Sequence, residues 1–406
     1  MAGTRGALTA VAALLALGVM PGDNAAPGDG PAATTGPTAE PTTAAPAPSP
    51  TTTPPTTVPP PRSFTLAATG DVLLHTPLWD QAAADAGGAG FDFRPLLGGV
   101  KPLVDEADLA ICHLETPVAP PGGPYASYPS FSVPPEIVGA LADTGYDACS
   151  TASNHTYDRG GAGVDRTLDA LDGAGLLHAG SARSPEEAGA ITTMTVAGAD
   201  VTLLSYTFGF NGIPAPDGQT WRANAIDEGR ILADAARARS QGAEVVVVAM
   251  HWGDEYRHDP NDQQRTLGPA LVRSPDIDLV LGHHAHVVQP IEPVDGEWVV
   301  HGMGNLVAHH GTSGVANEEG LLVRFTFTEG PGGWRVSQAG YAPLLVVKPG
   351  PPIRVVDVAA ALAAGDTTDP GTSARLQQAW DRTTAVVGSL DGPAHGLSPL
   401  ASPPAG

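Results

Sequence analysis

The sequence predicts a mixed α/β fold, on the strength of two patterns in its apolar residues. Six strand-length runs rich in Val, Ile, Leu and Ala recur between residues 64 and 305, and helical patterns separate several of them. Strands without polar alternation that are separated by helices are typical of a buried sheet with helices on its faces. Residues 191–208 and 321–339 instead have the pattern of β-hairpins. We therefore expect mixed β-sheets layered with α-helices.

The predicted elements follow in chain order. The strands are "FTLAATGDV", "ADLAICHLE", "YDACSTASNH", "EVVVVAMHWG", "IDLVLGHHAH" and "EWVVHGMGN". The helices are expected around residues 95–107, 135–144, 164–173, 227–241 and 264–273. Beyond residue 349 the apolar pattern weakens, and we expect one or two helices packed on the outside, followed by a loose tail.

Four segments are expected. Residues 1–26 hold an apolar run that is shorter than the roughly 20 residues needed to cross a bilayer, which indicates an export signal or, alternatively, an uncleaved anchor. Residues 27–62 are rich in Pro, Thr and Ala and predict an extended spacer. Residues 63–348 form the main folded domain, and 349–406 a helical extension with a loose tail. This order predicts a secreted or extracytoplasmic protein, attached to the membrane or cell wall if the first segment is retained.

The charge excludes one class of partner. Forty-three acidic residues against 20 basic ones give a formal net charge of −23, with no basic cluster along the chain. Nucleic acids and anionic lipids bind through Lys and Arg, so we expect no nucleic-acid partner. An acidic protein accepts an anionic substrate where metal ions reverse the local charge. The plain alternative is that the charge serves solubility.

The chain has two cysteines, Cys112 and Cys149, each at the end of an apolar run. In an exported protein they would be able to pair. A disulfide between adjacent strands has demanding geometry, however, and cysteine also packs as a small buried hydrophobe. We favour two free thiols.

Side chains that bind metals follow five of the predicted strands. In α/β sheets such strand ends meet at one edge, where ligands bind. Carboxylate, amide oxygen and imidazole suit Mn, Fe or Zn, and a bridging carboxylate would hold two divalent ions about 3.5–4 Å apart. The residues at these strand ends are Asp71, Glu115, Asn154, His155, His251, His284 and His286.

Six motifs also resemble a known family. "TGDVLLH", "HLETP", "SNHTYDRGGAGVDRTLDAL", "HWGDEY", "GHHAHVVQPIE" and "GMGN" are similar in order and spacing to the CapA-type capsule biosynthesis proteins. These belong to the calcineurin-like metallophosphatase superfamily and are associated with poly-γ-glutamate capsule synthesis and export. The resemblance covers residues 64–347. It implies a calcineurin-like metallophosphatase fold with a metal site at the carboxyl ends of the strands.

The resemblance also implies roles for individual residues. Glu115 stands where the superfamily has its bridging carboxylate, and His155 stands where a histidine protonates the leaving group. The first ion would be bound by Asp71 and His286. The second would be bound by Asn154, His251 and His284.

Two positions depart from the family pattern. Leu73 occupies the place of a histidine in the first motif, and His75 is the candidate substitute because it would face the same side of the strand. His113 stands where the CapA type commonly has Asn. We interpret His113 as a change in local hydrogen bonding rather than as an extra ligand.

Other residues near the motifs are candidates for supporting or substrate-binding roles. Asp158 either orients His155 or caps the next helix. Arg159 is either an anion contact or a surface residue, and Trp252 either packs or stacks on substrate. Glu255 is expected to line the pocket.

The remaining candidates are histidines and one asparagine. On an extended strand His283 would point away from His284 and His286, so it is expected either to support the ligands from behind or to pack there. His301 and Asn305 are expected to support the ligands. No role is expected for three loop histidines: His258, His309 and His310.

The sequence is compatible with three candidate functions. The first is a metal-dependent hydrolase of phosphate esters that acts on a surface polymer or another anionic substrate. The second is a non-catalytic accessory or polymer-binding protein that uses the metal site structurally, within a capsule-synthesis membrane complex. The third is a secreted binding module whose site has decayed. The family resemblance indicates a pathway and does not choose between them.

Overall fold

The computed structural model describes residues 61–401 apart from 311–314, 349–351 and 366–369. The expected segment 1–26 and nearly all of the spacer 27–62 lie outside the described residues. Within the described part of the chain, no helix combines the length and the apolar composition that crossing a membrane requires.

The first sheet has nine strands and is mixed. Its main path runs β14-β13-β12-β1-β2-β3-β4, with β11 beside β1 and β15 beside β13. Strands β1 to β4 are parallel, β12, β13 and β14 join the main path antiparallel, and β11 and β15 pair in parallel with β1 and β13. The bounds are Ser63–Leu73 (β1), Leu109–Leu114 (β2), Ala148–Ser150 (β3), Leu177–Ala179 (β4), Asn305–Ala308 (β11), Glu319–Gly330 (β12), Gly333–Val347 (β13), Arg354–Asp357 (β14) and Ser398–Pro399 (β15).

The second sheet has six strands in the order β5-β6-β7-β8-β10-β9. Strands β6, β7, β8 and β10 are parallel, and the two outer strands form antiparallel hairpins with their neighbours. The bounds are Thr192–Val196 (β5), Ala199–Thr207 (β6), Val245–His251 (β7), Leu279–His283 (β8), Ile291–Val294 (β9) and Glu297–Val300 (β10).

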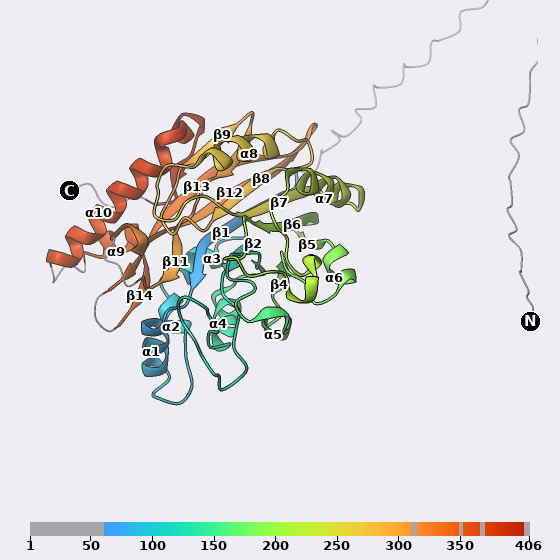
Figure 1. Cartoon of the computed structure of the whole chain (residues 1–406). Helices are drawn as coiled ribbons and strands as arrows, with labels where there is room; N and C mark the ends of the chain where they lie inside the picture. Colours follow the sequence, from blue (N-terminus) through green and yellow to red (C-terminus); the bar gives the residue numbers. More distant parts are fainter. Residues whose placement is uncertain (1–60, 311–314, 349–351, 366–369, 402–406) are drawn as a thin grey trace, which may run out of the picture. The chain divides into compact units, whose positions relative to one another are not determined.

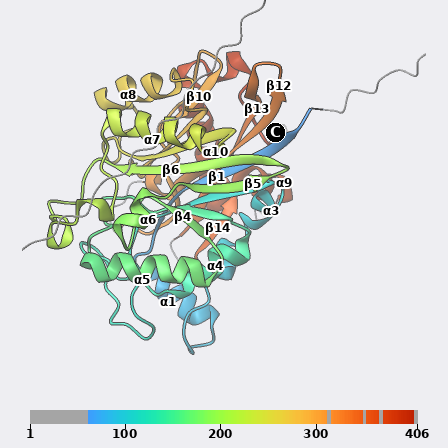
Figure 2. The same ribbon diagram turned by 90° about the vertical axis from the view of Figure 1, so that its right-hand side faces the viewer.

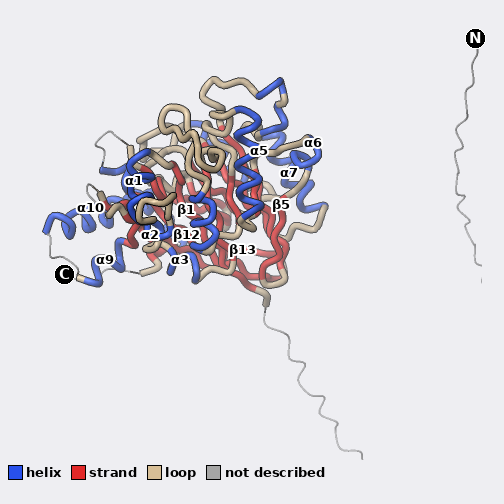
Figure 3. The backbone as a smooth tube through the Cα atoms, turned by 90° about the horizontal axis from the view of Figure 1, so that it is seen from below, coloured by secondary structure: helices blue, strands red, loops and turns tan. Residues whose placement is uncertain are grey.

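The two sheets pack face to face, and helices cover their outer faces. Phe64 and Leu66 of β1 share one buried core with Val247 of β7 and Leu281 of β8. Figures 1 and 2 show α7 and α8 on one side of the strands and α1, α4 and α5 on the other. Figure 3 views the strands from below, from the side of α1 and α5. The helices are Thr76–Asp85 (α1), Arg94–Leu97 (α2), Lys101–Asp105 (α3), Glu136–Thr144 (α4), Gly160–Gly173 (α5), Pro185–Gly189 (α6), Glu228–Ser240 (α7), Asp262–Val272 (α8), Val358–Ala364 (α9) and Pro370–Val387 (α10).

The mixed α/β fold is confirmed, with differences in particular elements. The helix expected at 95–107 is two short helices, because the chain passes close to β14 at Gly99, where a Cβ would lie 2.2 Å from the backbone oxygen of Val355. Residues 354–357 form strand β14, in a region where only helices and a loose tail were expected. Helix α1 was not expected, because its apolar pattern is short and alanine-rich.

The expectation of free thiols is wrong. Cys112 and Cys149 lie directly opposite each other on β2 and β3 and form a disulfide. Their Cα atoms are 4.4 Å apart, at the short end of the range that a disulfide spans. The register of β2 and β3 brings the two cysteines close enough to pair, which could not be predicted from the sequence alone.

Candidate metal centre

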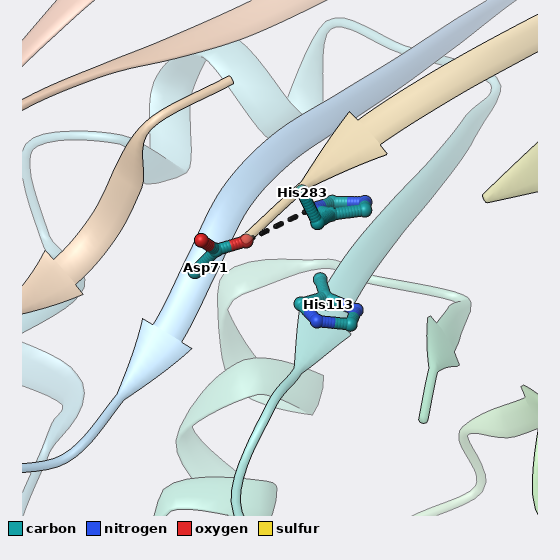
Figure 4. Close-up of side chains that lie close together, drawn as sticks. All are labelled: Asp71, His113 and His283. Carbon is teal, nitrogen blue, oxygen red and sulfur yellow. Dashed lines mark hydrogen bonds and ion pairs between the residues drawn. The ribbon is translucent and has the colours of Figure 1, made fainter. Parts of the chain in front are cut away.

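The ends of five strands bring the predicted ligands together. In the first sheet Asp71 of β1 lies opposite His113 of β2, which lies opposite Ser150 of β3. In the second sheet His251 of β7 lies opposite His283 of β8. Figure 4 shows Asp71, His113 and His283 where the two sheets meet, with their side chains turned toward one another. The strand register therefore places candidate ligand side chains from both sheets at one edge.

One group of candidate ligands consists of Asp71, Glu115 and His286, whose ligand atoms lie within 4.8 Å of one another. Asp71 Oδ2 is 3.1 Å from His286 Nδ1, and Glu115 Oε1 is 3.7 Å from His286 Nε2. The backbone N–H of His284 donates to Asp71 Oδ2. All three side chains are buried, so this group is enclosed by the protein.

A second group lies on the other side of Glu115. His251 Nε2 is 2.9 Å from Asn154 Oδ1 and 4.0 Å from Glu115 Oε1. The rings of His251 and His284 are 4.7 Å apart between centroids. Glu115 therefore lies between two sets of nitrogen and oxygen atoms, as a bridging carboxylate would.

Glu115 is buried without a hydrogen bond to its carboxylate. Among the described residues neither of its carboxylate oxygens has a hydrogen-bond partner, and the same holds for His284 Nδ1. Burial, together with the charge of Asp71, raises the pKa of Glu115 well above its usual value, although His286 opposes the shift. A buried carboxylate with no partner is costly. A bound cation would satisfy both oxygens, so the residues present fit a metal ion.

The imidazoles around Glu115 differ in the direction in which the protein shifts their pKa. Burial lowers the pKa of His113 and of His251 well below its usual value, and it lowers the pKa of His284 to about 3. These rings are neutral and keep a lone pair for a ligand. Burial also acts against the charged form of His286, but Glu115 and Asp71 outweigh it and raise the pKa of His286 to about 9.

Asp71 is the carboxylate that stays ionised. Burial alone would raise its pKa, but hydrogen bonds from His283 and His286 hold that pKa well below the usual value. The resulting negative charge at the end of β1 favours the binding of a cation in this site.

The expected direction of His283 is wrong. Strand β8 ends at His283, and His284 and His286 have φ angles of +87° and +54°, so the alternation of an extended strand does not continue through them. His283 Nδ1 lies 3.0 Å from Asp71 Oδ1, and its ring stacks on His113 at 4.1 Å. His283 therefore supports Asp71 from within the site.

His155 and Asp158 form a buried pair. His155 Nδ1 lies 2.8 Å from Asp158 Oδ2, which also accepts the backbone N–H of Phe131. Helix α5 begins at Gly160 without a side-chain cap. Of the two roles left open for Asp158, the geometry agrees with orienting His155.

Three further candidates lie around this centre. Arg159 is half-buried and donates to the Oγ and backbone oxygen of Ser130. Trp252 is fully buried and donates to the backbone oxygen of His301, so it is a packing residue. Glu255 is exposed, and its carboxylate lies within 4.8 Å of ring nitrogens of His284 and His286.

Asn305 begins β11 and lies beside β1, opposite Asp71. Its Oδ1 is 3.0 Å from His286 Nδ1, which agrees with the expected supporting role. His301 lies farther back, with Nε2 2.8 Å from Glu292 Oε2. His258 contacts the backbone oxygen of Val288, as expected for a loop residue.

Two histidines occupy unexpected places. His310 was expected to have no role, yet its ring lies 4.9 Å from that of His286 and 5.0 Å from that of His75. His75 accepts the backbone N–H of His309. None of the candidate metal clusters within the described ranges includes His75. The signal for His310 was the short run "NLVA" before it, which forms β11 and ends at the same edge.

A cavity of about 730 Å³ opens in front of the centre. Asn154, His155 and Glu255 connect it to the candidate ligands. Its lining is His75, Tyr128, Pro129, Ser130, Asn154, His155, Asp158, Asn211, Ile213, Glu255, Tyr256 and His310.

Together, the fold and this edge define a mixed α/β protein with a buried carboxylate–imidazole centre at its strand ends. The chain belongs to the family described as bacterial capsule synthesis protein PGA_cap, whose model matches residues 65–310. The resemblance to CapA-type proteins is confirmed.

Two curated relatives carry that name. The PGA biosynthesis protein CapA of Bacillus subtilis (strain 168) is 32% identical over 183 residues, which are 43% of this chain and 46% of that protein. The capsule biosynthesis protein CapA of Bacillus anthracis is 27% identical over 179 residues, 43% of each chain. The chain therefore matches about half the length of these relatives.

Among solved structures, the chain is similar to the calcineurin-like phosphoesterase YfkN from Bacillus subtilis. The TM-score is 0.42 at 16% identity, covering 80% of this chain and 98% of that one. A similarity of this size carries no conclusion about activity.

Proposed function

We propose that this chain is an exported, metal-dependent hydrolase of phosphate esters that acts in the synthesis or processing of a surface polymer. The observation that carries the proposal is Glu115. Its two buried oxygens have no hydrogen-bond partner in the described structure, and it lies between two groups of potential ligands. Such a carboxylate is stable in a folded protein when cations neutralise it.

Seven side chains divide into two ligand sets and one proton donor. Asp71 and His286 would hold one divalent ion with Glu115, and Asn154, His251 and His284 a second one with the same carboxylate. Mn, Fe and Zn suit these donors. Bound ions would supply Lewis-acid polarisation of a phosphoryl group.

His155 is the proposed general acid. Asp158 Oδ2 already accepts the Phe131 N–H, so it acts as an acceptor toward His155 Nδ1 as well. The carboxylate thereby orients the ring, and Nε2 is the atom that would give a proton to a leaving oxygen. His155 lines the cavity, where a substrate would reach it.

An extracytoplasmic location fits these features. The disulfide of Cys112 and Cys149 is of a kind that persists in oxidising compartments. With residues 1–26 as export signal or anchor and 27–62 as spacer, the domain 63–348 and its extension 349–406 would stand off from the membrane or wall. There the proposed partners are a surface polymer and a capsule-synthesis membrane complex.

The second candidate function is a non-catalytic accessory protein that uses the metals structurally. Leu73 favours it, because an apolar buried side chain stands where the superfamily has a ligand histidine. Asp71, His286 and Glu115 would then be the only ligands of the first ion, unless another group also binds it.

One experiment separates the two. The full-length chain would be loaded with Mn²⁺ and tested on phosphate monoesters and diesters, beside His251→Ala and the exposed-site control His395→Ala. We expect turnover that His251→Ala abolishes and His395→Ala retains. Metal binding without turnover of any ester would support the accessory function, and turnover by His251→Ala equal to wild type would refute the proposed site.

A further inference from the structure

The cavity in front of the candidate metal centre is poor in positive charge. None of its twelve lining residues is Lys or Arg, and two of them, Asp158 and Glu255, are acidic. The chain as a whole carries a formal charge of −23. A polyanionic ligand would therefore meet repulsion everywhere except at the metal ions themselves.

Two cations near the cavity, Arg159 and Lys348, have other partners. Both terminal nitrogens of Arg159 donate to Ser130, which holds the guanidinium against the loop. Lys348, which acts electrostatically on His75 and His310, is paired with Glu318 at 3.5 Å. Neither is free to neutralise a series of carboxylates along a bound chain.

Exposed aromatic side chains, rather than free cations, lie around the cavity and the candidate metal centre. Among the described residues the exposed large apolar side chains are five, and three of them flank the centre. Tyr128 is 75% exposed and lines the cavity, as does Tyr256 at 47%. Phe208 is 45% exposed, and its ring lies 4.5 Å from that of His284.

Two of the three rings, those of Phe208 and Tyr256, lie beside candidate metal ligands. Tyr256 lies 6.1 Å from His286 between ring centroids, and its hydroxyl is 3.3 Å from His310 Nδ1. Exposed aromatic faces bind flat or cyclic uncharged groups by stacking and by burial of apolar area. The neutral amides and hydroxyls of Asn211 and Ser130 add polar contacts without charge.

We propose that the site takes a phosphate ester with one anionic group at the metal centre and an uncharged, ring-bearing body between Tyr128, Phe208 and Tyr256. A polyanionic chain such as a polyglutamate is not its ligand. This substrate class rests on the proposed function, since the metals are what hold the anionic group. The ring-bearing body is held by the protein alone.

The test compares two ligands that differ only in the body. Phenylphosphonate and methylphosphonate carry the same anionic group, and binding of each to the full-length, Mn²⁺-loaded chain is measured by calorimetry. We expect phenylphosphonate to bind about tenfold more tightly. Tyr128→Ala and Tyr256→Ala should reduce that preference, Tyr256→Phe should retain it, and the control Leu177→Ala, an exposed apolar residue outside this cavity, should leave it unchanged.

A γ-linked oligoglutamate is added as competitor, and it should not displace phenylphosphonate. Equal affinity for the two phosphonates, or displacement by the oligoglutamate, would overturn the inference and leave the metal-dependent function standing. If neither phosphonate binds and no ester is turned over, both this inference and the proposed function are overturned.

Discussion

His113 Nε2 lies 3.0 Å from His251 Nδ1, and this contact joins the end of β2 in one sheet to the end of β7 in the other. His113 Nδ1 in turn lies 2.8 Å from Ser150 Oγ. If His251 Nε2 faces a metal ion, its Nδ1–H donates to His113, and His113 Nδ1–H donates to Ser150. The departure from the usual family residue thus fixes the tautomer of a proposed ligand.

The first prediction follows from this chain of contacts. His113→Phe keeps a ring that stacks on His283 but removes both hydrogen bonds, so we expect Mn²⁺ affinity to fall about 10- to 100-fold. Calorimetric titration measures the affinity, and circular dichroism checks that the variant folds. Ser150→Ala, which removes only the outer bond, should have a smaller effect. Unchanged affinity in His113→Phe would show that His113 does not orient His251.

The second prediction concerns Asp158. Asp158→Asn weakens the hold on His155, so we expect turnover to fall about 100-fold while Mn²⁺ affinity stays at the wild-type value. Steady-state kinetics and metal titration are run on the same preparation. Because α5 has no side-chain cap from this residue, thermal stability should change little. Loss of metal binding together with turnover would place Asp158 in the metal site instead.

The third prediction concerns the disulfide of Cys112 and Cys149, which closes a loop across a sequence separation of 37. The double variant Cys112→Ala/Cys149→Ala should lower the free energy of unfolding by about 2–4 kcal/mol. Urea denaturation without reductant measures it, and reductant should bring the wild type close to the variant. Identical denaturation midpoints for oxidised wild type and variant would contradict the bond's stabilising role.

The fourth prediction is a pH dependence that arises away from the metal centre. Burial and the nearby Asp278 raise the pKa of Glu297 from 4.5 to about 7. A carboxyl whose pKa is higher in the folded state favours folding while protonated, so its contribution is complete below pH 4.5 and is lost as the pH rises through 7. Because Glu297 is only partly buried, the loss is on the order of 1 kcal/mol.

Glu297→Gln removes this titration. We expect the variant to be more stable than wild type at pH 8 and close to it at pH 4, as measured by thermal unfolding at both values. The same stability difference at both pH values would mean that Glu297 does not titrate between them.

The α/β class and most strand ends could be predicted from the sequence, because apolar runs separated by helical patterns are typical of strands in a buried sheet. Asp71, Glu115, Asn154, His251, His284 and His286 could be chosen as candidate ligands because each lies at the end of such a run. Their convergence could be predicted from the rule that strand ends meet at one edge.

What the sequence could not predict depends on local backbone and register. The left-handed residues after β8 end the alternation, so His284 and His286 reach the same site as His283, and no period of two reveals that. His310 follows a four-residue strand that is too short to detect by pattern. The disulfide depends on Cys112 and Cys149 being register partners, which only the paired strands reveal.

Metal content tests the central claim most directly. The full-length chain, equilibrated with Mn²⁺ or Zn²⁺ and freed of excess, is analysed by inductively coupled plasma mass spectrometry beside Glu115→Gln and the control His395→Ala. We expect about two divalent ions per chain in wild type and control, and at most about one in Glu115→Gln. Wild type without bound divalent metal, or Glu115→Gln with the same content as wild type, would contradict the account.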